Sequence, residues 1–190
     1  MAAVGSESNS RKIITLCEKK IVSKMANSKA LTKMILDDDY NRLLDQALRV
    51  MEREIGAKEA DKRIKSIVKC SFKIGIMILN KEFSEKQMEQ IREFRGKFKR
   101  IALTVLSFHQ VDWSYSPDHL IKEAQEAEGV LMTCIKTKIK EKSRKKLSEA
   151  FSFFYDPDVL DKLFHKGEPY NDNLQLICNE LNQLLDKDKI

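Results

Sequence analysis

The stretch that decides the fold runs from Ser84 to Phe108, with the sequence SEKQMEQIREFRGKFKRIALTVLSF. Its apolar residues recur at alternating steps of three and four: Ile91, Phe94, Phe98, Ile101, Val105 and Phe108. This spacing places them on one face of an α-helix, so it predicts an apolar seam about five turns long. Ser84 and Gln87 match the capping box that opens many helices, and they predict where this one begins.

Helical spacing continues on both sides of this stretch. It predicts further helices at about 11–26, 31–36, 39–55, 57–80, 117–139, 147–154, 157–164 and 174–185. The stretches Ser116-Pro117-Asp118 and Asp156-Pro157-Asp158 are typical helix starts, and Gly56 is a typical stop. With only 6 glycines and 3 prolines, the chain has too few turn residues for a β-sandwich or barrel.

These patterns predict an all-α, single-domain antiparallel bundle of about seven helices. Residues 11–190 would form the domain, with 11–26 as a basic amphipathic first helix, and the small polar residues 1–10 are expected to be disordered. The longest apolar stretch, 67–79, is interrupted by Lys69 and Lys73 and is too short to span a bilayer. No signal peptide is recognisable, so a cytoplasmic protein is expected.

Catalytic and metal-binding motifs are not recognisable in the sequence. The three histidines fall in separate segments, and cysteines 17, 70, 134 and 178 show no paired spacing. We therefore expect a protein that is not an enzyme, with no catalytic residues, no metal and no cofactor. The cysteines are expected to be reduced and to pack as small apolar residues.

Basic residues gather in three places, although the chain as a whole carries only +6. The first is a basic interaction patch formed by Lys136, Lys138, Lys140, Lys142, Arg144, Lys145 and Lys146. The second is the first helix, and the third is a stripe at positions 58, 62, 65, 69 and 73. Each can be a solvated helix face, or it can bind an acidic protein or an anionic membrane. Nucleic acid is not expected, because the aromatic residues lie on predicted core seams and no recognition motif is present.

Three motifs resemble the tumour necrosis factor alpha-induced protein 8 family. The most specific is Leu103-Thr-Val-Leu-Ser-Phe-His-Gln-Val-Asp112, continuing to Trp113. Glu18-Lys-Lys-Ile-Val-Ser-Lys-Met25 and Leu176-Ile-Cys-Asn-Glu-Leu-Asn-Gln-Leu-Leu-Asp186 support it near the two ends. Their order and spacing cover residues 11–190.

The resemblance implies a helical bundle around a central hydrophobic cavity that binds, and in some cases transfers, phospholipids or phosphoinositides. It also implies signalling-protein partners, peripheral membrane association, and roles in cell death, autophagy and inflammation. By the resemblance, the headgroup phosphates would bind Lys19, Lys20, Lys24 and Arg95. Some relatives have a further arginine where this chain has Leu79, and Lys73, Lys81 or Lys69 would take its place.

Two hypotheses follow from the sequence. In the first, acyl chains of a bound phospholipid enter a cavity lined by Ile76, Leu79, Phe94, Phe98, Ile101 and Val105. In the second, the core is filled and the chain is purely a protein–protein signalling adaptor whose basic faces bind acidic partners. Apolar seams at helical spacing are consistent with both.

Overall fold

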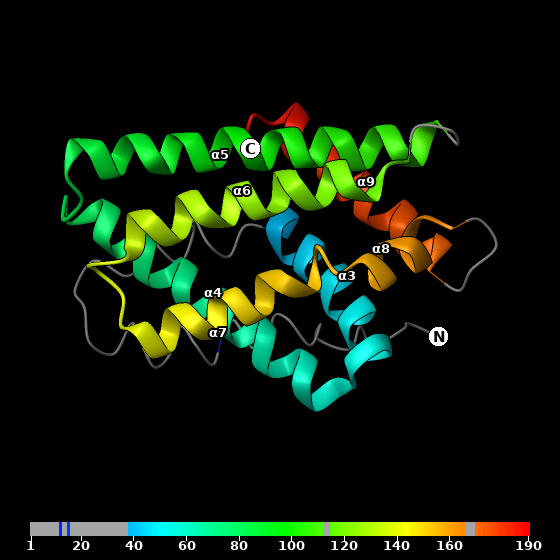
Figure 1. The fold of residues 1–190 in the computed structure, drawn as a ribbon, viewed down its shortest axis with the longest axis horizontal. Helices are drawn as coiled ribbons and strands as arrows, with labels where there is room; N and C mark the ends of the chain where they lie inside the picture. Colours follow the sequence, from blue (N-terminus) through cyan, green and yellow to red (C-terminus); the bar gives the residue numbers. More distant parts are fainter. Residues whose placement is uncertain (1–11, 13–14, 16–37, 112–114, 166–169) are drawn as a thin grey trace, which may run out of the picture.

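The computed structural model describes residues 38–111, 115–165 and 170–190, together with Lys12 and Thr15. Seven helices fill these ranges (Figure 1). They are α3 (Asp38–Ile55), α4 (Ala57–Leu79), α5 (Glu85–Gln110), α6 (Pro117–Ile135), α7 (Glu141–Phe153), α8 (Pro157–Phe164) and α9 (Asn171–Asp186). The described part of the chain contains no strand, so the predicted all-α class is confirmed.

Local sequence explains three of the helix ends. The Ser84 hydroxyl accepts from the backbone N–H of Gln87, whose side chain accepts from the Ser84 N–H, as the capping box predicts. The Asp156 carboxylate accepts from the N–H groups of Asp158 and Val159 at the start of α8. Gly56 ends α3 with a φ of 78°, a left-handed conformation that glycine adopts without steric cost.

Two expectations for α6, the cap at its start and the position of its end, need correction. The α6 helix begins at Pro117 as expected, but the Ser116 side chain makes no capping hydrogen bond. The same helix ends at Ile135, whereas the apolar spacing predicted a continuation to Ile139. The chain reverses direction at this point, because α7 packs back against α4 and α6. In this turn the Ile139 N–H donates to the Ile135 carbonyl, and Ile139 remains buried.

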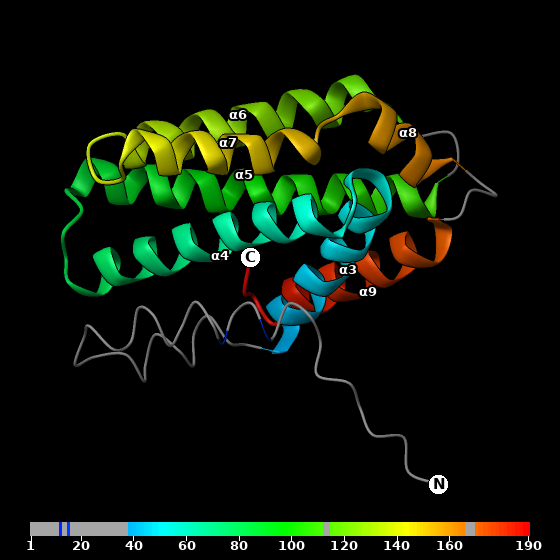
Figure 2. The ribbon, with the colours of Figure 1, turned by 90° about the horizontal axis from the view of Figure 1, so that it is seen from below.

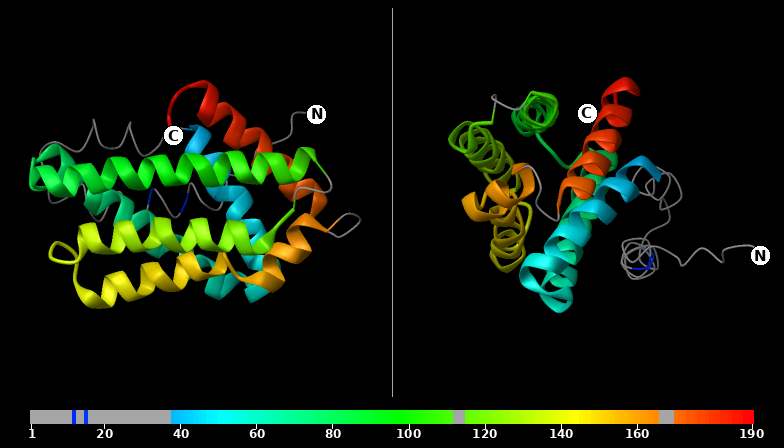
Figure 3. Two further views of the ribbon diagram at one scale, coloured as in Figure 1. Left: turned by 45° about the horizontal axis from the view of Figure 1, so that its top comes forward. Right: turned by 90° about the vertical axis from the view of Figure 1, so that its right-hand side faces the viewer.

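The helices pack as neighbouring pairs. The α5 helix lies along α6, α4 packs against both α3 and α7, and α9 packs against α3 and α5. Figures 2 and 3 show α6 and α7 on one side of the bundle and α3 with α9 on the other. The α4–α5 and α6–α7 connections lie at the same end of the long axis (Figure 1). They are in contact there, since Lys138 Nζ donates to the Glu82 carbonyl at 2.6 Å. The C-terminus lies close to α3 and α9 (Figure 2).

Three apolar clusters form the described core. The first is centred on Met51, Ile64 and Phe72 between α3 and α4. The second lies between α4 and the α6–α7 turn, and the third lies between α5 and α9. Cys70, Cys134 and Cys178 are buried free thiols, as expected, and burial raises the pKa of Cys178 to about 12. Within the described residues, no helix is both long and apolar enough to cross a membrane.

Candidate functional site

The apolar seam of α5 is only partly covered. Of the 26 residues in this helix, only Ala102 and Leu106 are buried. All six seam residues that predicted the helix are half-buried: Ile91, Phe94, Phe98, Ile101, Val105 and Phe108. A central helix normally buries such a seam, because exposed apolar area costs about 25 cal/mol per Å². This seam therefore offers apolar surface to a ligand or to a further segment.

The predicted cavity-lining residues border different parts of the core. Ile76 packs against the first cluster, Phe94 against the second, and Phe98 and Val105 against the third. The Phe94 ring lies 6.4 Å from the ring of Phe98 and meets Phe151 edge-on. Ile101 is half-buried on the same helix. Leu79, at the end of α4, is 45% exposed.

Arg95, the predicted headgroup arginine, contacts the C-terminal tail, which we define as residues 187–190. Its Nη2 atom donates to the Asp188 carbonyl at 2.6 Å and lies 3.9 Å from Asp188 Oδ1. Lys99, one helical turn along α5, places Nζ 3.7 Å from the same Oδ1 atom. The side chains of both cations remain about half exposed. Two cations thus converge on one carboxylate oxygen.

The tail itself is firmly anchored. The Asp39 carboxylate accepts from Nζ of both Lys187 and Lys189, at 2.6 Å each. The Tyr40 hydroxyl donates to the Lys189 carbonyl at 2.7 Å, and Ile190 is buried in the third core cluster. Hydrogen bonds from Lys187 and then from Lys189 hold the pKa of Asp39 far below its ordinary value.

A Schellman motif fixes the backbone of the tail. The Lys189 N–H donates to the Leu184 carbonyl, and the Asp188 N–H donates to the Leu185 carbonyl. This motif requires a left-handed residue, and Asp188 supplies it with a φ of 48°. Glycine is the usual choice at that position, so an aspartate there carries a conformational cost and brings a carboxylate with it.

Behind the tail, α3 and α9 share a second polar contact. Arg42 Nε donates to Glu180 Oε2 at 2.8 Å, and Nη2 donates to Gln183 Oε1 at 2.7 Å. The hydrogen bond to Glu180 raises the pKa of Arg42. These bonds hold the start of α3 against the end of α9 and thereby position Asp39 under the tail.

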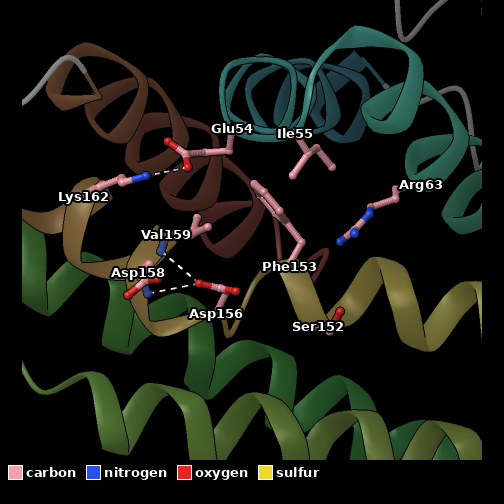
Figure 4. Close-up of a pocket in the computed structure, with 9 residues that line it drawn as sticks. All are labelled: Glu54, Ile55, Arg63, Ser152, Phe153, Asp156, Asp158, Val159 and Lys162. Carbon is pink, nitrogen blue, oxygen red and sulfur yellow. Dashed lines mark hydrogen bonds and ion pairs between the residues drawn. The ribbon is translucent and has the colours of Figure 1, made fainter.

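A cavity of about 290 Å³ lies between α3, α4, α7 and α8 (Figure 4). Ile55, Phe153 and Val159 form its apolar wall, and Asp156 caps α8 at its rim. Lys162 Nζ donates to Glu54 at 2.8 Å, while Arg63 Nη1 donates to the Glu149 carbonyl. Its wall mixes three acids with two bases, and all of these except Asp158 already have internal partners. It therefore gives no preference for a phosphate.

The remaining predicted site residues are spread widely. Lys19, Lys20 and Lys24 lie outside the described residues. Lys73 is exposed on α4, as are Lys58, Lys62 and Lys69, so most of the predicted lysine stripe reaches solvent. The structure brings Arg95 together with the C-terminal tail, and it gives no contact between Arg95 and Lys73.

The predicted basic patch covers the α6–α7 turn and the first half of α7. Lys138 and Arg144 donate to the backbone carbonyls of Glu82 and Ile139. The other five side chains are exposed and make no hydrogen bond or ion pair with a described residue: Lys136, Lys140, Lys142, Lys145 and Lys146. Their charge is therefore free to attract an anionic surface.

Sequence reasoning missed the tail and its anchor. Lys99 and Asp188 lie 89 positions apart, and neither belongs to a recognisable motif. The charged run Asp186-Lys-Asp-Lys189 after the last apolar residues of α9 was a visible sign of a structured helix end. It could not show which residues across the bundle would meet it.

Comparisons with known proteins agree over nearly the whole chain. The model of a family described as "Tumor necrosis factor alpha-induced protein 8-like" matches residues 8–188. Tumor necrosis factor alpha-induced protein 8 of Bos taurus is 33% identical over 183 residues, which cover 96% of this chain and 92% of the relative. Tumor necrosis factor, alpha-induced protein 8-like protein 2 B of Danio rerio is 31% identical over 179 residues, which cover 94% of this chain and 96% of the relative. Tumor necrosis factor alpha-induced protein 8 of Homo sapiens is 31% identical over 183 residues, which cover 96% of this chain and 92% of the relative.

Proposed function

This chain belongs to the tumor necrosis factor alpha-induced protein 8-like family, and from that premise we propose that it is a lipid-binding signalling regulator. In this proposal it is not an enzyme. It binds a phospholipid or phosphoinositide, associates peripherally with membranes from the cytoplasm, and acts in cell death, autophagy and inflammatory signalling through protein partners. The relatives are named for induction by tumor necrosis factor alpha, which supports a place in such signalling.

The half-buried seam of α5 is the observation that carries lipid binding. Phe94, Phe98, Ile101 and Val105 place aromatic and branched side chains along one helix face, and none of the four is fully buried. Acyl chains are a chemically matched partner for such a seam, since covering each buried methylene group is worth about 0.8 kcal/mol. A lipid tail lying along α5 would cover apolar area that the described fold leaves accessible.

The charge at the side of this seam suits a phosphate headgroup. Arg95 and Lys99 project from α5 with about half of each side chain exposed. Arginine binds phosphate through two parallel N–H groups, which makes it a better phosphate ligand than a lone ammonium. Lys19, Lys20 and Lys24 are proposed to add charge from the first helix, and Lys73 from α4.

The basic patch adds a contact with the membrane surface. Each basic residue close to an anionic leaflet is worth about 1 kcal/mol, and five of these lysines have no described side-chain partner. Protein interfaces, by contrast, are depleted in lysine and depend on arginine and aromatic residues. The composition of the patch therefore favours binding to a bilayer over binding to an acidic protein. An acidic protein is the partner that the adaptor hypothesis requires.

Charge reversal in the first helix tests the headgroup assignment. The variant Lys19→Glu/Lys20→Glu should lose binding to phosphatidylcholine vesicles that contain phosphoinositide, measured by flotation. The variant Arg49→Glu/Lys86→Glu is a matched control, because it reverses two exposed basic residues that have no described partner and lie outside the three basic regions. Unchanged flotation of the first variant would remove Lys19 and Lys20 from the site.

A further inference from the structure

We propose that Arg95 and Lys99 form an anion-binding site that the chain's own C-terminal tail occupies, so that a phosphate group must displace the Asp188 carboxylate to bind. The nature of the displacing ligand rests on the proposed function. The occupied site itself rests on the contacts of Arg95, Lys99 and Asp188, which join α5 to the end of α9.

The carboxylate fills this site incompletely. A single oxygen, Oδ1, faces both cations, at 3.9 Å from Arg95 and 3.7 Å from Lys99. Both separations exceed hydrogen-bonding distance, so the carboxylate is attracted to the two cations without a direct bond from either. A phosphate monoester has three terminal oxygens and a larger charge, and it can accept from both side chains at once. The geometry therefore favours phosphate over the internal carboxylate.

The backbone conformation of Asp188 holds its side chain beside Arg95 and Lys99. The Schellman motif places this residue in the left-handed region, where glycine fits best. An aspartate there is disfavoured by its own backbone, and its carboxylate gains no backbone partner within the tail. The contact it does gain is with Arg95 and Lys99. An aspartate in this position therefore acts as an internal anion placed on the site.

The tail can release the site without unfolding. Its anchors are Lys187 and Lys189 on Asp39, the Tyr40 hydroxyl bond, and the buried Ile190, none of which involves Asp188. The Asp188 side chain is 85% exposed, and ion pairs at that exposure are weak. A rotation of this side chain would move its carboxylate away from both cations and leave the anchors in place. Arg95 would keep its hydrogen bond to the Asp188 backbone carbonyl.

Affinity for a soluble headgroup tests the proposal. Binding of inositol 1,4,5-trisphosphate to the full chain would be measured by isothermal titration calorimetry. Asp188→Asn removes the internal anion and keeps a residue that tolerates the left-handed conformation, so it should bind about three- to tenfold more tightly. Asp186→Asn removes the same charge from an exposed residue that has no described partner, and should change affinity less than about twofold.

The double variant Arg95→Gln/Lys99→Gln separates the two parts of the proposal. Its affinity should fall at least about tenfold, because both phosphate ligands are removed. If the double variant binds as well as the wild type, the proposed anion site is wrong. Lipid binding along the α5 seam is tested separately, by detecting lipid in the purified protein. If the double variant fails but Asp188→Asn and Asp186→Asn bind equally, the site stands and its occupation by the tail is overturned.

Discussion

The guanidinium of Arg95 and the backbone carbonyl of Asp188, 93 positions later, share a hydrogen bond of 2.6 Å. This bond joins the middle of the bundle's longest described helix to the segment that ends the chain. It also means that the arginine that we propose as a phosphate ligand already has an internal partner. The state of the tail and the state of the site are therefore linked.

Loss of the Asp39 charge should destabilise the tail. In Asp39→Asn, Lys187 and Lys189 lose the carboxylate that both contact, and the melting temperature should fall by several degrees. A carboxyl group with a depressed folded-state pKa stabilises the fold fully above its unfolded pKa of about 3.9, and loses that contribution as pH falls further. The difference in melting temperature between wild type and variant should therefore be present at pH 7 and shrink below about pH 4.

Glu89→Gln is the control for this experiment, because Glu89 is exposed on α5 and has no described partner. Its melting temperature should match that of the wild type at both pH values. An Asp39→Asn protein as stable as Glu89→Gln at pH 7 would mean that the tail anchor contributes nothing to stability.

Adjacent phenylalanines offer a matched test of the core. Phe153 is buried against the first cluster, with 4% of its surface exposed, whereas Phe154 is 37% exposed. Truncating a buried phenylalanine to alanine removes buried apolar atoms and leaves a cavity in the core. Phe153→Ala should therefore lower the free energy of unfolding by about 3–5 kcal/mol. Phe154→Ala should cost clearly less. Urea denaturation measures both, and equal losses would contradict the described packing of α7.

Two serines test the assignment of helix caps. Ser84→Ala removes a side chain that accepts from the Gln87 N–H, and should cost about 1 kcal/mol of unfolding free energy. Ser116 precedes Pro117 in a sequence that is just as favourable, but it makes no capping hydrogen bond, so Ser116→Ala should be close to neutral. Chemical denaturation measures both losses of unfolding free energy. A larger loss in Ser116→Ala than in Ser84→Ala would contradict the assignment of the two caps.

The Tyr155 phenol should titrate late. Its hydroxyl donates to the buried Glu128 carboxylate at 2.8 Å, and burial together with this bond raises the pKa of Tyr155 to about 12. A phenol with a raised folded-state pKa stabilises the fold below its unfolded pKa of about 10, and this contribution is lost as pH rises toward 12. The phenolate absorbance of wild type minus Tyr155→Phe should show that titration, and a midpoint near 10 would contradict the burial.

Much of the fold follows from local patterns that sequence displays directly. The α5 seam, the Ser84 capping box, the Asp156 cap and the Gly56 stop depend on residues within one or two turns of each other, so their spacing was sufficient. The predicted end of α6 was wrong, because the apolar spacing continues to Ile139 while the helix ends at Ile135. Periodicity records burial, and Ile139 is buried without being helical.

The candidate site was harder to predict because its parts are distant in sequence. Arg95 came from the resemblance to a family, while Lys99, Asp188 and Asp39 meet only after α3, α5 and α9 have packed together. An ion pair between residues that are far apart in the chain produces no periodic pattern in the sequence, so it cannot be predicted from spacing. The same limit applies to the α5 seam, whose spacing is identical whether side chains or a ligand cover it.

Native mass spectrometry of the gently purified protein, with phospholipid extracted from the same sample, tests lipid binding most directly. The account predicts a population heavier than the 22.0 kDa chain by the mass of one phospholipid, and a matching lipid in the extract. A single lipid-free mass with no phospholipid in the extract would contradict it. The protein would then be an adaptor, with the exposed lysines of the 136–146 patch as its binding surface.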